Sequence, residues 1–109
     1  MISAEQIILL KDVIVQTMQP EKIYLFGSYA NGTANEHSDL DILIEVKHTD
    51  VPYLERNLEV WTAMDRTKKL RFPKDIFVYT SPEVLEFKQN KYSFLSSILK
   101  TGKIIYASN

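Results

Sequence analysis

The sequence contains no cysteine, so neither a disulfide nor thiolate chemistry contributes to its structure or activity. A large charge of either sign is also missing, since 13 Lys and Arg residues stand against 14 Asp and Glu residues for a formal net charge of −1. A near-neutral chain gives no bulk electrostatic reason to expect a nucleic-acid or membrane surface. We therefore expect a cytoplasmic protein that binds neither nucleic acid directly nor a membrane.

Long apolar runs are absent as well, because no stretch approaches the roughly 20 residues that a membrane span needs. Near the N-terminus, Glu5 and Lys11 interrupt an Ile- and Leu-rich run, which favours an amphipathic helix over a signal peptide. At 109 residues the chain has the size of one domain. We expect a single domain over residues 1–109, without linkers or internal repeats.

The order of apolar segments predicts alternating helices and strands. Ser3 followed by Gln6 resembles a capping box, and helical spacing of apolar residues predicts a helix over 4–18, which ends before Pro20. A second stripe at helical spacing, through Leu54, Leu58, Trp61 and Asp65, predicts a helix between about 52 and 70. Strands are expected at 22–26, 40–46 and 75–79, and further helices at 83–89 and 92–100, separated around Asn90 and closed by Gly102.

Two groups of basic side chains are expected at the surface without a functional role. The basic cluster Lys68, Lys69, Arg71 and Lys74 is expected to be a solvated helix end. The two histidines, His37 and His48, are expected at the surface, because hard cations in oxygen-rich sites seldom use imidazole.

The turn after the first strand carries the first chemical signal. An apolar strand runs into Gly27, which lets the backbone turn sharply and approach a ligand closely, while Ser28 offers a hydroxyl and begins a short helical turn. Backbone N–H groups at such a turn favour phosphate oxygens, and Gly32 suits a left-handed residue at its end. Gly27 and Ser28 are therefore candidate nucleotide-binding residues, and an ordinary helix cap at Ser28 is the alternative.

Two aspartates flank the beginning of the next strand. Side chains at positions i and i+2 of a strand leave the same face, so Asp39 and Asp41 are expected to project together. Neighbouring carboxylates repel one another unless a cation lies between them, and Mg²⁺ is commonly held by one or two carboxylates plus substrate phosphates. The metal-binding interpretation competes with that of two solvated acids at a strand edge.

A third acid completes the candidate set. Asp75 stands at the start of the strand expected at 75–79, which follows Pro73 and could lie beside the strand that carries Asp41. Two-metal sites that stabilise the attacking and leaving oxygens of an in-line displacement usually need such a further carboxylate. The alternative for Asp75 is a turn residue.

The stretch from Gly27 to Ile44, with Gly-Ser followed by Asp-x-Asp, resembles the signature of the minimal nucleotidyltransferases of the DNA polymerase β-like superfamily. The resemblance covers most of the chain, because the leading helix, the later acidic strand and the closing helix with its tail Gly102–Tyr106 follow in the family's order. It implies an α/β polymerase β-like palm fold, a small mixed sheet flanked by helices. It also implies that Asp39, Asp41 and Asp75 are catalytic and hold two Mg²⁺ ions on ATP, with Ser28 and the Gly27 backbone on the terminal phosphates.

One position departs from the family pattern. Many members have an arginine where this chain has Asn31, and that arginine is expected to contribute local charge or phosphate contacts. Its loss bears on the strength of nucleotide binding and leaves the metal site unchanged. Asn31 also suits the conformation of a turn.

The resemblance extends to a biological role. Stand-alone minimal nucleotidyltransferases resemble antitoxins whose partners are HEPN-type ribonuclease toxins, which they neutralise by adding AMP to a toxin tyrosine. We therefore expect a Mg²⁺-dependent protein adenylyltransferase that uses ATP and assembles with a HEPN-type toxin encoded nearby. The alternatives are a catalytically weak antitoxin that acts by binding alone, and a nucleotidyltransferase of small molecules.

Overall fold

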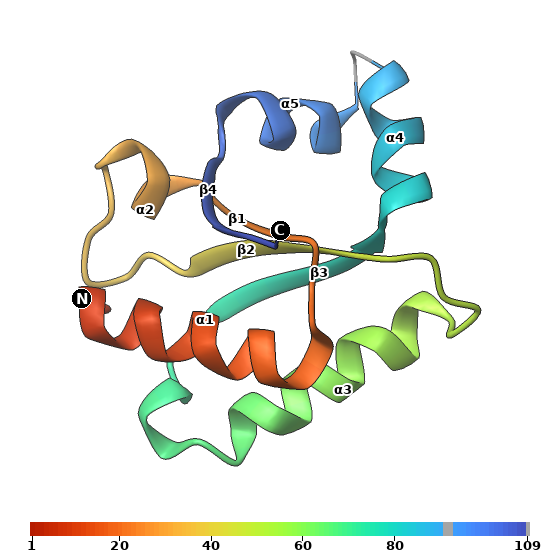
Figure 1. The fold of residues 1–109 in the computed structure, drawn as a ribbon. Helices are drawn as coiled ribbons and strands as arrows, with labels where there is room; N and C mark the ends of the chain where they lie inside the picture. The colour runs from red at the N-terminus through yellow and green to blue at the C-terminus, as the bar shows by residue number, and fades with distance from the viewer. Residues whose placement is uncertain (91–92, 109) are drawn as a thin grey trace.

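A four-stranded mixed sheet with helices on both faces forms the centre of the computed structural model, which describes residues 1–90 and 93–108 (Figure 1). The predicted α/β class, with a small mixed sheet flanked by helices, is therefore confirmed. In chain order the elements are α1 (Ala4–Met18), β1 (Lys22–Phe26), α2 (Ser28–Asn31), β2 (Leu40–Val46), α3 (Tyr53–Asp65), the 3₁₀ helix η1 (Lys68–Leu70), β3 (Lys74–Thr80), α4 (Ser81–Gln89), α5 (Phe94–Thr101) and β4 (Lys103–Ala107).

The strands lie in the order β3-β2-β1-β4. β1 pairs antiparallel with both β2 and β4, whereas β2 and β3 are parallel and are connected through α3. The pairing of β4 with β1 was not predicted, because the segment from Gly102 to Tyr106 was expected only as a tail of the closing helix. The predicted neighbourhood of the strands that carry Asp41 and Asp75 is confirmed.

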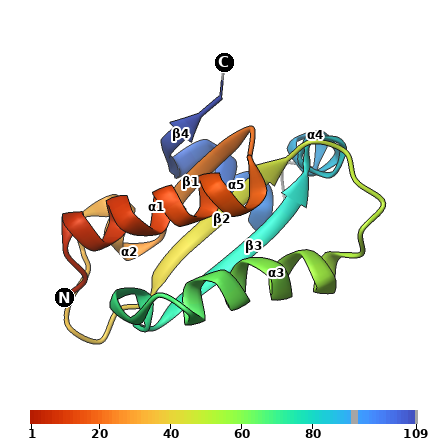
Figure 2. The same cartoon turned by 60° about the horizontal axis from the view of Figure 1, so that its bottom comes forward.

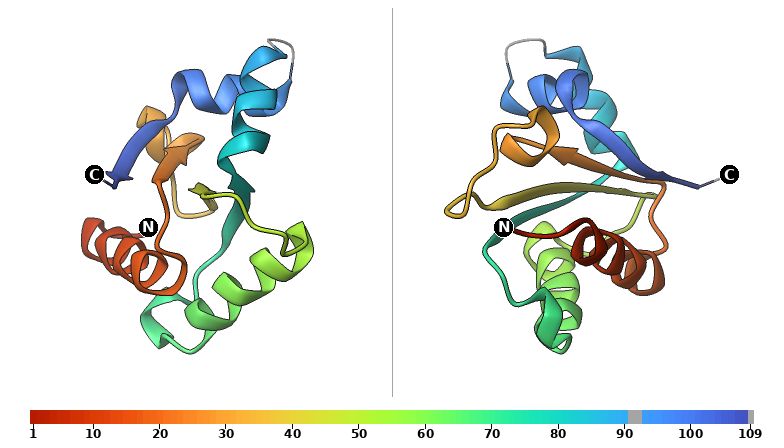
Figure 3. Two further views of the ribbon diagram at one scale, coloured as in Figure 1. Left: turned by 45° about the vertical axis from the view of Figure 1, so that its right-hand side comes forward. Right: turned by 90° about the vertical axis from the view of Figure 1, so that its left-hand side faces the viewer.

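Alternating side chains divide the sheet into two packed faces. α1 and α3 lie side by side on one face and α4 and α5 cover the other, as Figures 2 and 3 show from different sides. Along β2, Ile42 and Ile44 join the core beneath α1 and α3, while Leu43 joins the smaller core beneath α5. Odd-numbered residues of β2 therefore face α4 and α5, and this parity decides where the candidate acids project.

The first helix begins and ends as predicted. Ser3 Oγ accepts a hydrogen bond from the Gln6 amide at 3.1 Å, and Gln6 Oε1 accepts one from the Ser3 amide at 2.9 Å, so the capping box is present. After Met18 the chain adopts a left-handed conformation at Gln19, with φ 48°, and leaves the helix before Pro20. Buried Leu10 and Ile14 fix the face of α1 that packs on the sheet.

The helix predicted between about 52 and 70 is present but shorter than expected. α3 ends at Asp65 and is followed by η1. Leu54, Leu58 and Trp61 are 70%, 56% and 37% exposed, whereas the helix buries the other side, including Arg56. The guanidinium of Arg56 is buried because Glu83 binds it at 2.7 Å and two backbone carbonyls accept its N–H groups.

The basic cluster was also predicted only in part. Lys68, Lys69 and Arg71 are exposed, as expected. Lys74 is instead buried, because its Nζ donates to the carbonyls of Leu70 and Phe72 and lies 5.0 Å from the centre of the Trp61 ring. Burial accordingly lowers the pKa of Lys74.

The C-terminal helices follow the predicted break. α4 has a capping box between Thr80 and Glu83 and ends before Asn90. α5 begins at Phe94 and ends at Thr101, with Gly102 as its C-cap, while residue 92, the predicted start of this helix, lies outside the described residues. Within the described part of the chain, no helix is long and apolar enough to cross a membrane.

Candidate functional site

A row of three side chains crosses the sheet at one end. Phe26 of β1 stands opposite Asp41 of β2, and Asp41 stands in register with Asp75 of β3. All three belong to the face that α4 and α5 cover, because their strand neighbours Leu43 and Phe77 join the core on that face. The structure therefore brings together two of the three predicted acids on adjacent strands.

Asp39 lies just before β2 and is exposed. The strand geometry that predicted a common face for Asp39 and Asp41 applies only to Asp41, since β2 begins at Leu40. Asp39 nevertheless lies close enough for its charge to raise the pKa of Asp41. It therefore forms an outer, solvated member of the acidic set.

The turn after β1 lies directly against Asp41. Gly27 has φ 71°, a conformation that favours glycine. A Cβ atom built on Gly27 would overlap the Asp41 carboxylate, so the absence of a side chain lets the turn approach the acid. The sequence predicted a close approach at Gly27, but the neighbour it approaches emerged only from the pairing of β1 with β2.

Ser28 is the first residue of the short helix α2, and Gly27 occupies the N-cap position. The helix-cap alternative for Ser28 is therefore wrong. The Gly27 carbonyl accepts hydrogen bonds from the amides of Ala30 and Asn31, at 3.0 and 3.1 Å. Among the residues that the structure describes, none accepts a hydrogen bond from the amides of Ser28 and Tyr29, so both can reach an anionic ligand.

The electrostatics of the acidic set centre on Asp41. Burial, then the charges of Asp75 and Asp39, then a hydrogen bond with Asp75 raise the pKa of Asp41 to about 6. A raised pKa means that the folded protein resists placing a full negative charge here without a compensating cation. A ligand with positive charge would remove this conflict.

The donor set suits a divalent cation of the oxygen-binding kind. Asp41 and Asp75 offer carboxylate oxygens from adjacent strands, and Asp39 adds a third from the solvent side. Within residues 1–90 and 93–108, no three His, Cys, Asp or Glu side chains already stand in a metal-binding cluster. The arrangement therefore fits the mode in which one or two carboxylates share an ion with substrate phosphates.

The Asn31 side chain stabilises the turn at the end of α2. Its Oδ1 accepts hydrogen bonds from the Thr33 amide at 3.1 Å and from the Thr33 hydroxyl, and Gly32 follows in the left-handed conformation with φ 81°. The predicted turn role of Asn31 and the predicted conformation of Gly32 are confirmed. Both histidines, His37 and His48, are exposed, also as predicted.

A small pocket of about 240 Å³ opens beside the glycine turn, between α2 and α5. Phe26 forms part of its wall, and the Phe94 ring meets the Phe26 ring edge-on at 6.3 Å while remaining 66% exposed. This pocket could not be predicted from the sequence, because α5 and α2 come together only through the fold. The lining residues are Phe26, Gly27, Ala30, Asn31, Phe94, Ser97, Ile98 and Thr101.

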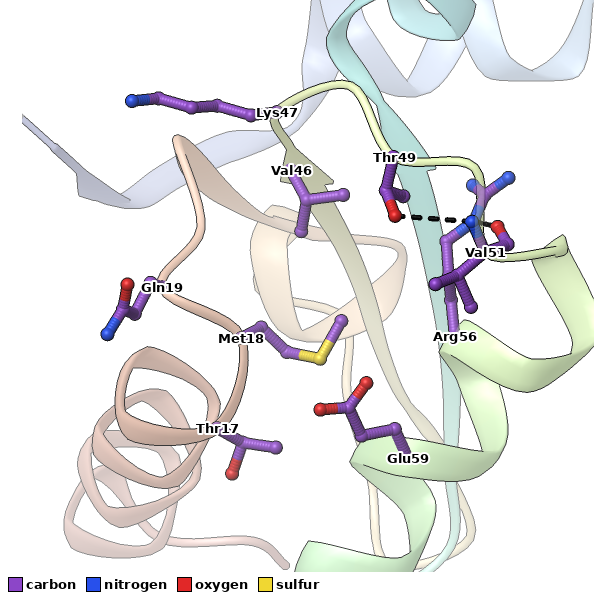
Figure 4. A pocket seen from close by; sticks show the side chains of 9 residues that line it. All are labelled: Thr17, Met18, Gln19, Val46, Lys47, Thr49, Val51, Arg56 and Glu59. Atoms are coloured by element: carbon purple, nitrogen blue, oxygen red, sulfur yellow. Dashed lines mark hydrogen bonds between the residues drawn. The ribbon is translucent and has the colours of Figure 1, made fainter.

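A second pocket, of about 300 Å³, lies between the end of α1, the end of β2 and the first turns of α3 (Figure 4). It includes Val46, the last residue of β2, whereas Asp41 is near the first. In Figure 4, Arg56 donates to the Val51 carbonyl, so its charge is already engaged in the protein. The nine lining residues are Thr17, Met18, Gln19, Val46, Lys47, Thr49, Val51, Arg56 and Glu59.

Comparison with known sequences places this geometry in a family context. The chain matches the family model described as "Polymerase beta, Nucleotidyltransferase" over residues 9–109. It is 35% identical over 86 residues to a Methanocaldococcus jannaschii protein provisionally named a protein adenylyltransferase, covering 79% of this chain and 78% of that protein. A second M. jannaschii protein with the same provisional name is 31% identical over 61 residues, covering 56% and 61% respectively.

Solved structures share the fold. A provisionally assigned nucleotidyltransferase from Sulfolobus solfataricus superposes with a TM-score of 0.59 at 21% identity, covering 94% of this chain and 83% of that chain. A chain from a toxin–antitoxin crystal structure with AMP-PNP gives a TM-score of 0.50 at 21% identity, covering 96% and 73%. At these identities the likeness concerns the fold alone.

Proposed function

The chain belongs to the polymerase β nucleotidyltransferase family, and on this premise we propose that it transfers AMP from ATP to a hydroxyl group of a partner protein. One observation carries the proposal: the Gly27 turn lies against the carboxylate of Asp41, which stands in register with Asp75. This contact joins an anion-binding turn to a pair of acids. A triphosphate and its cations need both.

The turn is assigned to the phosphates of ATP. The amides of Ser28 and Tyr29 point to no acceptor in the described part of the protein, and the Ser28 hydroxyl begins the helix beside them. These donors would hold the terminal phosphates, with Gly27 allowing the phosphate chain to pass close to the backbone. Bound at this turn, the triphosphate would lie beside Asp41 and Asp75.

Asp41 and Asp75 are the residues that would hold Mg²⁺, and Asp39 would add a ligand from the solvent side. Two bound ions would neutralise the charge that builds up on the phosphate oxygens. Because the pKa of Asp41 is raised to about 6 by burial and by its acidic neighbours, the acids already favour an added positive charge.

The transfer is an in-line displacement at the α-phosphorus. The acceptor oxygen forms a bond to phosphorus, the bond from that phosphorus to the bridging oxygen of the β-phosphate breaks, and pyrophosphate leaves. The proton of the acceptor hydroxyl passes to a carboxylate oxygen of Asp75 and from there to water. Positioning of the reacting groups and neutralisation of charge supply most of the rate.

For the acceptor we propose a tyrosine hydroxyl of a HEPN-type ribonuclease toxin encoded beside this gene, bound in a cytoplasmic complex. Two lines of support exist. Relatives in M. jannaschii carry provisional protein adenylyltransferase names, and a structural neighbour comes from a toxin–antitoxin complex with the ATP analogue AMP-PNP. The first favours a protein acceptor, and the second favours a toxin as that protein.

The test is to incubate the protein with ATP, Mg²⁺ and the product of the adjacent reading frame, and to measure the intact mass of that product. We expect the added mass of AMP with the wild type and none with Asp41→Ala. Asp50→Ala is the matched control, because the Asp50 side chain is fully exposed. An unmodified product in every reaction would refute transfer to this partner.

A catalytically weak antitoxin is the second candidate, and Asn31 is the observation that favours it. In this structure the Asn31 side chain is engaged with Thr33 within the turn. Because an asparagine amide is uncharged, this position supplies no cation where many family members have an arginine. If a variant with Asp39, Asp41 and Asp75 all changed to Ala still neutralises the toxin, binding alone accounts for the antitoxin role.

A further inference from the structure

The proposed AMP transfer leaves unused the pocket of about 240 Å³ between α2 and α5, although this pocket adjoins the same turn. Gly27 belongs both to its wall and to the turn that lies against Asp41. Phe26, another wall residue, stands directly opposite Asp41 in the pairing of β1 with β2, where facing Cα atoms lie about 4.5–5.5 Å apart. The pocket therefore begins one strand away from the acids.

The lining of this pocket suits an uncharged, flat group. Phe26, Ala30 and Ile98 are apolar and buried, and no charged side chain stands among the described residues that line the pocket. An anion would find no cation there, so the pocket is not a second phosphate site. Its volume is below the roughly 300–1,000 Å³ of pockets that enclose a drug-sized ligand, so it fits one part of a nucleotide.

Phe94 adds an open aromatic ring to the wall. It is the first residue of α5 and is 66% exposed. Its ring contacts the Phe26 ring edge-on, with 6.3 Å between the ring centres. Because this contact leaves the side chain mostly exposed, the ring remains able to stack on a ligand. Aromatic side chains of this kind bind nucleobases by stacking, and every base has a face that can stack.

These observations assign an occupant to the pocket. We propose that it holds the nucleobase of the triphosphate, with the Phe94 ring stacked on the base. The phosphates would lie on the turn at Gly27, and the ribose would connect the turn with the pocket. Because Gly27 belongs to both, one nucleotide can occupy them together. This inference rests on the proposed function, which assigns the turn to the phosphates.

The polar groups of the pocket bear on base selectivity. Two of them are already engaged, since the Thr101 hydroxyl donates to the Ser97 carbonyl at 2.9 Å and Asn31 Oδ1 accepts from Thr33. The Ser97 hydroxyl can donate or accept a hydrogen bond, so it suits the amino group of adenine and the oxo group of guanine equally. We therefore expect stacking to hold the base, and similar affinities for ATP and GTP.

Calorimetric titration in the presence of Mg²⁺ tests the proposal, with ATP and inorganic tripolyphosphate as separate ligands. Tripolyphosphate has the phosphates of ATP but no base. We expect Phe94→Ala to raise the Kd for ATP by about tenfold or more and to leave the Kd for tripolyphosphate unchanged. Phe94→Tyr keeps the ring and should bind ATP like the wild type. Leu85→Ala is the matched control, because Leu85 is 60% exposed on α4 and does not line the pocket.

Filling the pocket is a second test that leaves the Phe94 ring in place. Ser97 is exposed on α5 and lines the pocket, so Ser97→Leu should fold and should occupy part of the space for the base. We expect this variant to bind ATP more weakly and tripolyphosphate as the wild type does. The wild type should bind ATP and GTP with Kd values within about tenfold of each other, because no fixed contact distinguishes the two bases.

Several results would overturn the base site while Asp41-dependent AMP transfer stands. One is an unchanged Kd for ATP in both Phe94→Ala and Ser97→Leu, even if labelling of the partner falls, which would assign the ring to the acceptor. Others are an equal loss of ATP and tripolyphosphate binding, or a preference for one purine well above tenfold. If the variants respond as expected but the wild type modifies no partner, the proposed function fails and the base site stands.

Discussion

Gly27 and Asp41 are in direct contact across β1 and β2: the glycine backbone lies so close to the aspartate carboxylate that a Cβ atom would overlap it. This contact places the helix start at Ser28 beside the acids of β2 and β3. The amides that we propose for phosphate binding and the carboxylates that we propose for cation binding therefore lie on one small surface.

Gly27→Ala should abolish AMP transfer and destabilise the fold. The substitution adds strain at φ 71° and forces the Asp41 carboxylate to move. Gly32→Ala is the matched control, since Gly32 has φ 81° but open space around its Cβ position. We expect Gly32→Ala to cost about 1–2 kcal/mol of stability by chemical denaturation and to retain activity. Equal loss of activity in both variants would contradict a specific role for the contact.

Asp41→Asn should abolish transfer while making the metal-free protein more stable at neutral pH. The folded state raises the pKa of Asp41 from its usual 3.8 to about 6, so ionisation costs stability as the pH rises through this range. We expect a gain of about 1–2 kcal/mol near neutral pH, after allowance for solvent screening. The gain should shrink as the pH falls below 6 and Asp41 becomes protonated in the wild type. Thermal melts at several pH values measure this stability difference, with Asp50→Asn as the control. An Asp41→Asn variant that is less stable than the wild type at neutral pH would contradict the prediction.

Mg²⁺ binding should weaken in acid. A proton and a cation compete for the Asp41 carboxylate, and its pKa of about 6 sets where the competition begins. Calorimetric titration without ATP excludes protonation of the nucleotide itself. We expect affinity to be nearly constant above this pKa and to fall by about tenfold per pH unit below it. An affinity that does not vary with pH would show that Asp41 is not a ligand.

Ser28→Ala should weaken ATP binding and leave the fold intact. The Ser28 hydroxyl makes no cap bond, because Gly27 holds the N-cap position of α2. Loss of one hydrogen bond to a charged phosphate should raise the KM for ATP by about tenfold or more. Ser108→Ala removes a hydroxyl that bonds Glu21 and serves as the control. If Ser28→Ala and the control have the same KM, the hydroxyl does not contact the nucleotide.

Arg56→Ala should be strongly destabilising without a direct effect on the reacting groups. Its guanidinium is 8% exposed and binds Glu83 at 2.7 Å, so truncation leaves that carboxylate without its partner. We expect a loss of about 3–5 kcal/mol in the free energy of unfolding. The hydrogen bond from Arg56 lowers the pKa of Glu83, so this ion pair stabilises the fold above the usual glutamate pKa and less so as the pH falls. Denaturation of both proteins at neutral and acidic pH checks magnitude and direction, and a small, pH-independent loss would contradict the account.

The candidate site residues could be predicted from the sequence because their signals are local. Gly27-Ser28 and Asp39-x-Asp41 are short patterns, and Asp75 begins a strand whose parallel pairing with β2 is confirmed. What local patterns could not supply is the partner of each group. That Gly27 touches Asp41 depends on the register of β1 and β2, and the pocket beside Phe94 depends on how α5 returns to α2.

The buried face of α3 could not be predicted for the same reason. Leu54, Leu58 and Trp61 recur at helical spacing, and an apolar stripe normally packs inward, yet all three are exposed. The fold instead buries Arg56, which finds Glu83 and the carbonyl of Val78 far along the chain. Similarly, Lys74 was predicted to be solvated because it is charged. The fold instead buries it, since two nearby carbonyls accept its N–H groups. Polar groups that are satisfied by the fold cannot be recognised from hydrophobicity alone.

The most direct test of the central claim is the fate of each phosphate of ATP. The protein is incubated with its proposed toxin partner and Mg²⁺, using ATP labelled either at the α-phosphate or at the γ-phosphate. The account predicts that label from the α-phosphate becomes covalently attached to the partner, and that label from the γ-phosphate appears only in pyrophosphate. Asp41→Ala should abolish both the labelling of the partner and the release of labelled pyrophosphate. Label transferred from the γ-phosphate, or α-label transferred equally well by Asp41→Ala, would contradict it.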